Sequence, residues 1–335
     1  MNEQTLKAIM TAERQVRSLA PWLNVGGQQL FTLKRDNPLD NVFVNIIGLQ
    51  SGDCGLVFYE GLRQLQDYMM LLARADLGLT YDYVMRRQNC LALMYGQPDG
   101  MSAELLKTYQ EAGYDTEDSL PAFISLRTGL QPWLLNEEET DRMAVILPEF
   151  VAAWNCWLAA GKPAFGTDQM FLYDPQNDTG RVTVLPLKDY GTNLLQIDRN
   201  QVLEAMKGCE ETEQTVEADL RYMPMPVEHP GYDRPIRPLA FVAVEQESGY
   251  LMNMELGEPD LNPGQLLIEG LITAMQKHGI PAVIRVRGDL FAAMIDSLCE
   301  PLGIRVEQTD DLPGAEAAFQ GLYEYFESRH SSLLS

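Results

Sequence analysis

The sequence predicts an α/β C-terminal domain, a mixed sheet with helices in the order β-β-α-β-α-β-α, following a larger α+β N-terminal domain. At 335 residues, the chain exceeds the usual size of one hydrophobic core. Five prolines within residues 224–238 deny that stretch a regular helix, and beyond them apolar strands alternate with amphipathic helices. We therefore expect an N-terminal domain over residues 1–210, a proline-rich linker over 211–238 and a C-terminal domain over 239–335.

The N-terminal domain is expected to combine mostly antiparallel strands with flanking helices, since sequential strands usually pair antiparallel. Asn136 is the candidate cap of its longest helix, with Glu139 at the capping-box position, and Pro148 predicts a kink or a restart. Apolar runs predict strands at 29–33, 42–47, 55–59, 90–94, 122–126, 170–173 and 181–185, and periodicity predicts helices at 3–19, 61–76 and 136–160.

The C-terminal domain has the clearest pattern in the chain. Turn residues at 247–249 predict a hairpin, and Asn262, Pro263 and Gly279 mark the start and end of the helix that follows it. The crossover helices predict parallel strands after that helix. The expected strands are 239–244, 250–254, 282–287 and 304–306, and the expected helices are 263–278, 289–298 and one from about 313.

Charge and composition disfavour several kinds of partner. The formal net charge is −23, from 25 basic and 48 acidic side chains, so the long-range field repels nucleic acid and anionic lipid. The first residues lack the charged and apolar regions of a secretory signal, and no apolar stretch is long enough for a membrane span. We expect a cytoplasmic protein with a protein or small-molecule partner.

Motifs for common chemistries are missing from the sequence. The five cysteines show no C-x-x-C spacing, and the three histidines have no partner at the spacing of a metal site. The glycine patterns of phosphate-binding and dinucleotide-binding loops do not occur either. We therefore predict no cofactor.

Carboxylates near the predicted strand ends are the remaining candidates for chemistry. Ligands in open α/β sheets bind beyond the carboxyl ends of strands, where the sequence supplies Glu245, Glu247 and Asp289. Glu245 and Asp289 are the candidate catalytic residues, and all three are candidate ligands of Mg²⁺. The competing interpretation makes Glu245 and Glu247 turn residues and Asp289 a helix cap, and the sequence favours it.

Several motifs resemble known domain families. In the second half they are residues 237–249, 281–287 and 302–306, and in the first half Pro21-Trp22, residues 59–61 and residues 171–174. On these motifs, the two halves resemble two uncharacterised bacterial domain families of unknown function that occur together in one chain. The resemblance implies a fold and names no activity.

The C-terminal domain is also similar to the ribonuclease-H-like nuclease fold. The similarity lies in a hairpin followed by α-β-α-β-α, an acid after the first strand, and the segment 284–291 before a helix. By this analogy Glu245 and Asp289 stand near the metal ligands of that family. The sequence departs from the pattern in three respects: two predicted strands, not three, precede the first helix, the first acid is a glutamate, and a basic substrate groove is missing.

Two functions from different classes follow. The first is binding or protein interaction without catalysis, and the alternative is a metal-dependent phosphoester hydrolase that uses Glu245 and Asp289. Trp154 and Trp157 lie three residues apart on the long predicted helix, which favours burial, although a homo-oligomer through that helix stays open.

Overall fold

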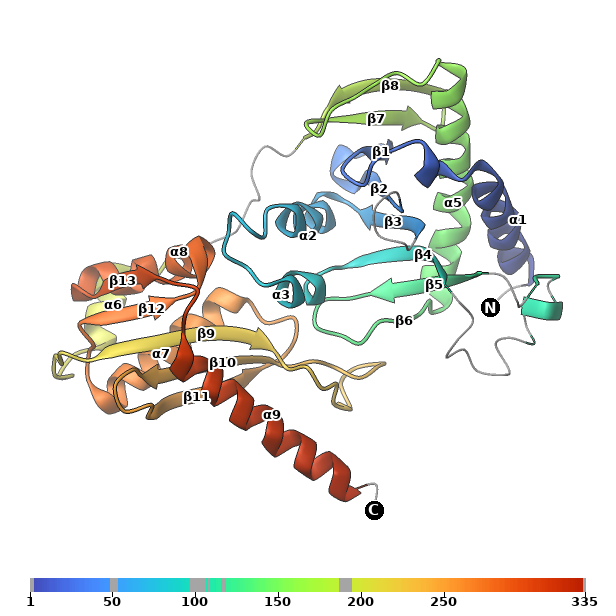
Figure 1. The fold of residues 1–335 in the computed structure, drawn as a ribbon. Coiled ribbons are helices and arrows are strands. Elements are labelled where there is room, and N and C mark those ends of the chain that lie inside the picture. The colour runs from blue at the N-terminus through green and yellow to red at the C-terminus, as the bar shows by residue number, and fades with distance from the viewer. Residues whose placement is uncertain are drawn as a thin grey trace. The chain divides into compact units, whose positions relative to one another are not determined.

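The computed structural model describes residues 3–48, 54–96, 107, 109–111, 113–115, 119–186 and 195–333. The chain forms two compact units, an N-terminal unit of residues 1–68, 88–127 and 132–190 and a C-terminal unit of residues 69–87, 128–131 and 191–335 (Figure 1). Two short segments from the first half of the chain, residues 69–87 and 128–131, therefore belong to the C-terminal unit. The main part of this unit starts at residue 191, earlier than the expected residue 239.

The N-terminal unit is built, in its described part, on an eight-stranded sheet with the order β6-β5-β4-β3-β2-β1-β7-β8. Successive strands from β1 to β6 pair antiparallel, as predicted, whereas β1 and β7 are parallel. The strands are β1 (Leu30–Leu33), β2 (Val42–Ile47), β3 (Cys54–Glu60), β4 (Cys90–Gly96), β5 (Leu120–Leu126), β6 (Trp133–Leu134), β7 (Gln169–Asp174) and β8 (Thr179–Val184).

Two helices, α1 (Glu3–Leu19) and α5 (Glu137–Ala159), pack on this sheet around a core that includes Trp154 and Trp157 (Figure 1). The predicted capping box starts α5: Asn136 Oδ1 accepts from the Glu139 amide at 2.9 Å, and Glu139 Oε2 accepts from the Asn136 amide at 3.0 Å. Of the kink or restart expected at Pro148, the restart does not occur, because α5 continues through this residue. Short 3₁₀ helices lie at Pro21–Leu23 and Pro38–Asp40, and α2 (Leu62–Leu72) runs from the N-terminal unit into the segment that belongs to the C-terminal unit.

The C-terminal unit contains, among its described residues, a five-stranded mixed sheet with the order β11-β10-β9-β12-β13. β10 is antiparallel to both β9 and β11, whereas β12 is parallel to both β9 and β13. The elements are α3 (Tyr81–Arg86), α6 (Arg199–Ala205), β9 (Thr215–Tyr222), β10 (Leu239–Glu245), β11 (Leu251–Gly257), α7 (Pro263–His278), β12 (Val283–Val286), α8 (Gly288–Cys299), a 3₁₀ helix at Glu300–Leu302, β13 (Arg305–Gln308) and α9 (Pro313–Leu333).

Helices cover both faces of this sheet. α7 and α8 pack on one face, where Val216, Ala218, Leu220 and Tyr222 of β9 join the main apolar core. The other face meets α9, whose Ala315, Phe319 and Leu322 form a smaller cluster with Ala240 and Val242 of β10. The α/β class predicted for this domain is therefore confirmed.

The predicted linker over residues 211–238 contains the central strand of the sheet, β9. The acidic residues Glu217 and Asp219, followed by the prolines of 224–238, predicted a linker or an edge-strand crossing between domains, whereas β9 lies at the centre of the sheet. Glu217 and Asp219 are in fact buried. With β9 in place, three strands precede the first helix of the β-α-β-α series, which removes one departure from the ribonuclease-H-like pattern.

Among the described helices, none is both long enough and apolar enough to cross a membrane.

Candidate functional site

Glu245, the first acid selected from the sequence, closes the β10–β11 hairpin. Its Oε1 accepts from the Glu247 amide at 3.0 Å and its Oε2 accepts from the Ser248 amide at 2.7 Å and from the Ser248 hydroxyl. These hydrogen bonds, the Ser248 hydroxyl foremost, lower the pKa of the Glu245 carboxyl. Glu247 is an exposed residue of the same turn. The Glu245 carboxylate is thus committed to the turn.

Asp289, the second acid, is exposed in the first turn of α8, which follows β12, a strand that runs in the direction opposite to β10. Glu245 pairs with Val216 near the start of β9, whereas Val286, the last residue of β12, pairs with Ala218. Val286 thus lies two residues, about 7 Å, beyond the level of Glu245, and Asp289 follows three residues later. The structure does not bring Glu245 and Asp289 together, because β10 runs antiparallel to β9 and β12.

The carboxyl ends of β9 and β12 form the place where strand order reverses. From β9 the chain continues to β10 on one side, and after β12 it continues to β13 on the other side. Open α/β sheets bind ligands beyond the strand ends at such a switch point. Arg221 and Tyr222 end β9 there, and Arg287 follows β12.

A buried carboxylate, Asp219, is held there between two arginines. Asp219 is 1% exposed, and its Oδ2 lies 2.9 Å from Nη2 of Arg221 and 3.6 Å from Nε of Arg287. Its Oδ1 accepts from the Leu220 amide at 2.9 Å. Burial raises the pKa of the Asp219 carboxyl, and the two guanidinium groups oppose that rise. The pair Arg221 and Arg287 thus compensates a charge that the core would otherwise disfavour.

Glu316, in the first turn of α9, meets the same two arginines from the solvent side. Its Oε1 accepts from Nη2 of Arg287 at 3.2 Å and lies 3.6 Å from Nη2 of Arg221. Arg287 also donates to the carbonyl of Asp310 at 2.7 Å, and the Arg221 guanidinium lies 4.8 Å from the centre of the Phe319 ring. Two acids and two arginines therefore form one network between the sheet and α9.

A cavity of about 280 Å³ opens onto this network, and we call it the switch-point pocket. Burial raises the pKa of the Tyr323 hydroxyl in its wall. Among the described residues, no three histidine, cysteine, aspartate or glutamate side chains are grouped closely enough to hold a metal ion. The pocket offers hydroxyl groups, aromatic rings and the arginine–carboxylate network, and it is lined by Thr80, Asp82, Tyr83, Arg221, Tyr222, Arg287, Glu316 and Tyr323.

Sequence reasoning missed Asp219, Arg221 and Glu316. It placed Arg287 at a strand end without giving it a role. The signal that could have found the site is the alternation in residues 215–222, where every second residue is apolar and the residues between them include two acids and an arginine.

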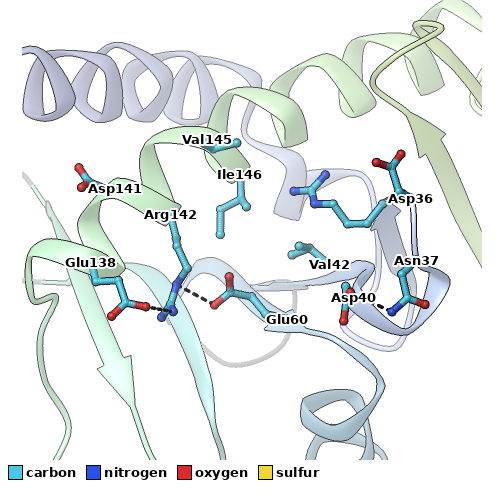
Figure 2. Close-up of a pocket in the computed structure, with 11 residues that line it drawn as sticks. Asp36, Asn37, Asp40, Val42, Glu60, Glu138, Asp141, Arg142, Val145 and Ile146 are labelled. Atoms are coloured by element: carbon cyan, nitrogen blue, oxygen red, sulfur yellow. Dashed lines mark hydrogen bonds and ion pairs between the residues drawn. The ribbon is translucent and has the colours of Figure 1, made fainter.

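A larger depression of about 690 Å³ lies in the N-terminal unit (Figure 2). Arg142 stands between two acids there, with its Nε 3.3 Å from Glu60 and its Nη1 3.0 Å from Glu138. Burial raises the pKa of the Glu60 carboxyl. Five carboxylates against two guanidinium groups make this depression unsuited to an anion; its lining is Arg35, Asp36, Asn37, Asp40, Val42, Glu60, Glu138, Asp141, Arg142, Val145 and Ile146.

Two domain families match the chain. Residues 7–171 match the family described as Domain of unknown function (DUF7309), and residues 202–323 match Domain of unknown function (DUF6930). The expected resemblance to two domains of unknown function in one chain is confirmed. No curated protein matches the sequence.

Two solved structures are similar to part of the chain. The catalytic core domain of BIV integrase is 16% identical, with 36% of this chain and 74% of that chain covered and a TM-score of 0.27. A simian T-cell lymphotropic virus intasome in complex with PP2A regulatory subunit B56 gamma is also 16% identical, with 35% and 42% covered and a TM-score of 0.25. At these TM-scores the likeness supports no conclusion, so the fold assignment rests on strand order and pairing.

Proposed function

We propose that the protein acts by binding a protein or small-molecule partner, not by catalysis, and that the switch-point pocket receives the ligand. The observation that carries this proposal is the neutralisation of Asp219 by Arg221 and Arg287. A metal-dependent hydrolase needs carboxylates that are free to hold an ion. A metal at Asp219 would have to break two ion pairs that are largely shielded from water, which is costly.

The alternative, a metal-dependent phosphoester hydrolase, has little support from its named residues. β10 and β12 run in opposite directions, so Glu245 and Asp289 lie toward opposite ends of these strands. Glu247 lies in the same turn as Glu245, so it too is separated from Asp289. Mg²⁺ belongs only to this alternative, and we propose no cofactor for the binding function.

The partner class follows from charge. With a net charge of −23, the protein is a poor match for nucleic acid or an anionic membrane, so a protein or small molecule in the cytoplasm remains the proposed partner. Trp154 and Trp157 are buried in the N-terminal unit, so they offer no support for a homo-oligomer through α5.

The decisive experiment is a phosphodiesterase assay with bis(p-nitrophenyl) phosphate in Mg²⁺ or Mn²⁺, on the wild type and on Asp219→Asn and Glu245→Ala. We expect the same background rate for all three proteins. Metal-dependent turnover by the wild type that either substitution abolishes would overturn the proposal. A small-molecule screen by ¹⁵N NMR then tests binding directly, and ligands should shift the amide signals of Tyr83 and Tyr323. Hits that shift only signals outside the switch-point pocket would contradict this location of the site.

A further inference from the structure

We propose that Arg221 and Arg287 form a binding site for a small oxyanion, a carboxylate or a phosphate group, and that Glu316 occupies this site as an intramolecular competitor. The inference rests on the proposed function, because it assigns a ligand class to the switch-point pocket. An oxyanion would replace the Glu316 carboxylate between the two guanidinium groups.

The convergence of two arginines on one oxygen is the first support. Nη2 of Arg287 and Nη2 of Arg221 lie 3.2 Å and 3.6 Å from the same Oε1 of Glu316. Guanidinium groups are the side chains best suited to carboxylate and phosphate, because they present several donors in a fixed plane. The Glu316 carboxylate therefore marks where an oxyanion fits.

The difference in burial between the arginines and Glu316 is the second support. Arg287 is 11% exposed and is fixed by Asp219 and the Asp310 carbonyl, and Arg221 is fixed by Asp219 and the Phe319 ring. The Glu316 side chain is 52% exposed, and ion pairs at such exposure contribute little. The arginines are thus held in place before a ligand arrives, while the group that fills the site is weakly held.

The charge balance of the pocket is the third support. Two guanidinium groups face one buried carboxylate, Asp219, so displacement of Glu316 leaves one positive charge in excess. Asp82, on the pocket wall, is itself paired with Arg86 at 2.7 Å. The Thr80 and Tyr323 side chains also line the cavity, and its volume of about 280 Å³ suits a small ligand.

The test is calorimetric titration of inorganic phosphate at constant ionic strength into the full-length wild type, Glu316→Gln and Glu324→Gln. Glu324 is the matched control, because it is an exposed glutamate of the same helix, its Oε1 accepts from Gln320, and it does not line the switch-point pocket. Glu316→Gln should bind phosphate about tenfold more tightly than the wild type, since an occupied site lowers apparent affinity by the fraction that is free. Glu324→Gln should match the wild type.

A second substitution tests the arginines. In the Glu316→Gln background, Arg287→Lys should remove the gain, and Arg221→Lys provides the same comparison if circular dichroism shows that the first double variant is unfolded. The proposal is overturned if Glu316→Gln binds phosphate no better than Glu324→Gln, or if both arginine replacements keep the gain. The phosphodiesterase assay tests the binding function, whereas the phosphate titration tests only this inference. A failed titration without metal-dependent turnover would therefore overturn the inference and leave the binding function standing.

Discussion

Arg287, which follows β12, is paired with Asp219 of the neighbouring parallel strand β9: Nε of Arg287 lies 3.6 Å from Oδ2 of Asp219, and the two side chains are 11% and 1% exposed. The two residues lie far apart in the sequence, and only the pairing of β9 with β12 brings them together. This ion pair neutralises the Asp219 carboxylate on the central strand of the sheet.

Replacement Asp219→Ala should lower the free energy of unfolding by about 3 kcal/mol, because it removes the buried carboxylate that pairs with Arg221 and Arg287. Urea denaturation at neutral pH measures the change, with exposed Glu324→Ala as the control that should stay within about 0.5 kcal/mol of the wild type. Equal midpoints for the two variants would show that the pair does not stabilise the fold.

Replacement Ser248→Ala should lower stability by about 1 kcal/mol at pH 7, because the Ser248 hydroxyl is the main group that lowers the pKa of the Glu245 carboxyl. A carboxyl whose pKa is lowered in the folded state stabilises the protein above its unfolded pKa of about 4.3, and this contribution disappears as the pH falls through the folded value. The difference between the two proteins should therefore shrink below about pH 4. Urea denaturation from pH 7 to pH 3 tests this, and a constant difference would contradict it.

Replacement Gly270→Ala should destabilise the C-terminal unit by about 2 kcal/mol, although alanine is the better helix former. A Cβ at Gly270 would lie 2.3 Å from Cδ1 of Phe241, inside the packed core between α7 and β10. Gly321→Ala in α9 is the matched control, since a Cβ there meets no atom within 4 Å, and it should stabilise the protein by up to about 1 kcal/mol. Thermal and urea unfolding compare the two, and changes of the same sign would refute the packing argument.

Replacement Asn136→Ala should cost about 1 kcal/mol, because the first turn of α5 loses the side chain that accepts from the Glu139 amide. Asn136→Asp keeps an acceptor at this position and should remain close to the wild type. Far-ultraviolet circular dichroism during urea unfolding provides the readout. A loss of similar size in both variants would assign the effect to something other than the cap.

Much of the fold could be predicted because its signals are local. The Asn136–Glu139 capping box, the turn after Glu245 and the start of α7 at Asn262 depend on residues a few positions apart, and all three occur as expected. Asn262 accepts from the Gly264 amide at 2.9 Å, and Pro263 needs no hydrogen bond at the first helical position. Each of these features is determined by residues that are at most three positions apart in the sequence.

The candidate site could not be predicted in the same way. The segment with Glu217, Asp219 and Arg221 has the charge of a solvated linker, yet it forms the central strand, because Arg287 and α9 supply partners for its charges. Glu245 ends β10 and Asp289 follows β12, but these two strands run in opposite directions, so the two acids lie toward opposite strand ends.

The sequence by itself predicted the longer helices, the caps of α5 and α7, the hairpin turn and the α/β class, whereas α3 and α6 were not predicted and Asp289 lies inside α8, whose N-cap is Arg287. Only the tertiary structure decided which strand lies at the centre of the sheet and which acids meet. The physical reason is that caps and turns are satisfied by neighbours in the chain, whereas a buried charge is tolerated only when distant residues, here Arg287 and the start of α9, bring it a partner.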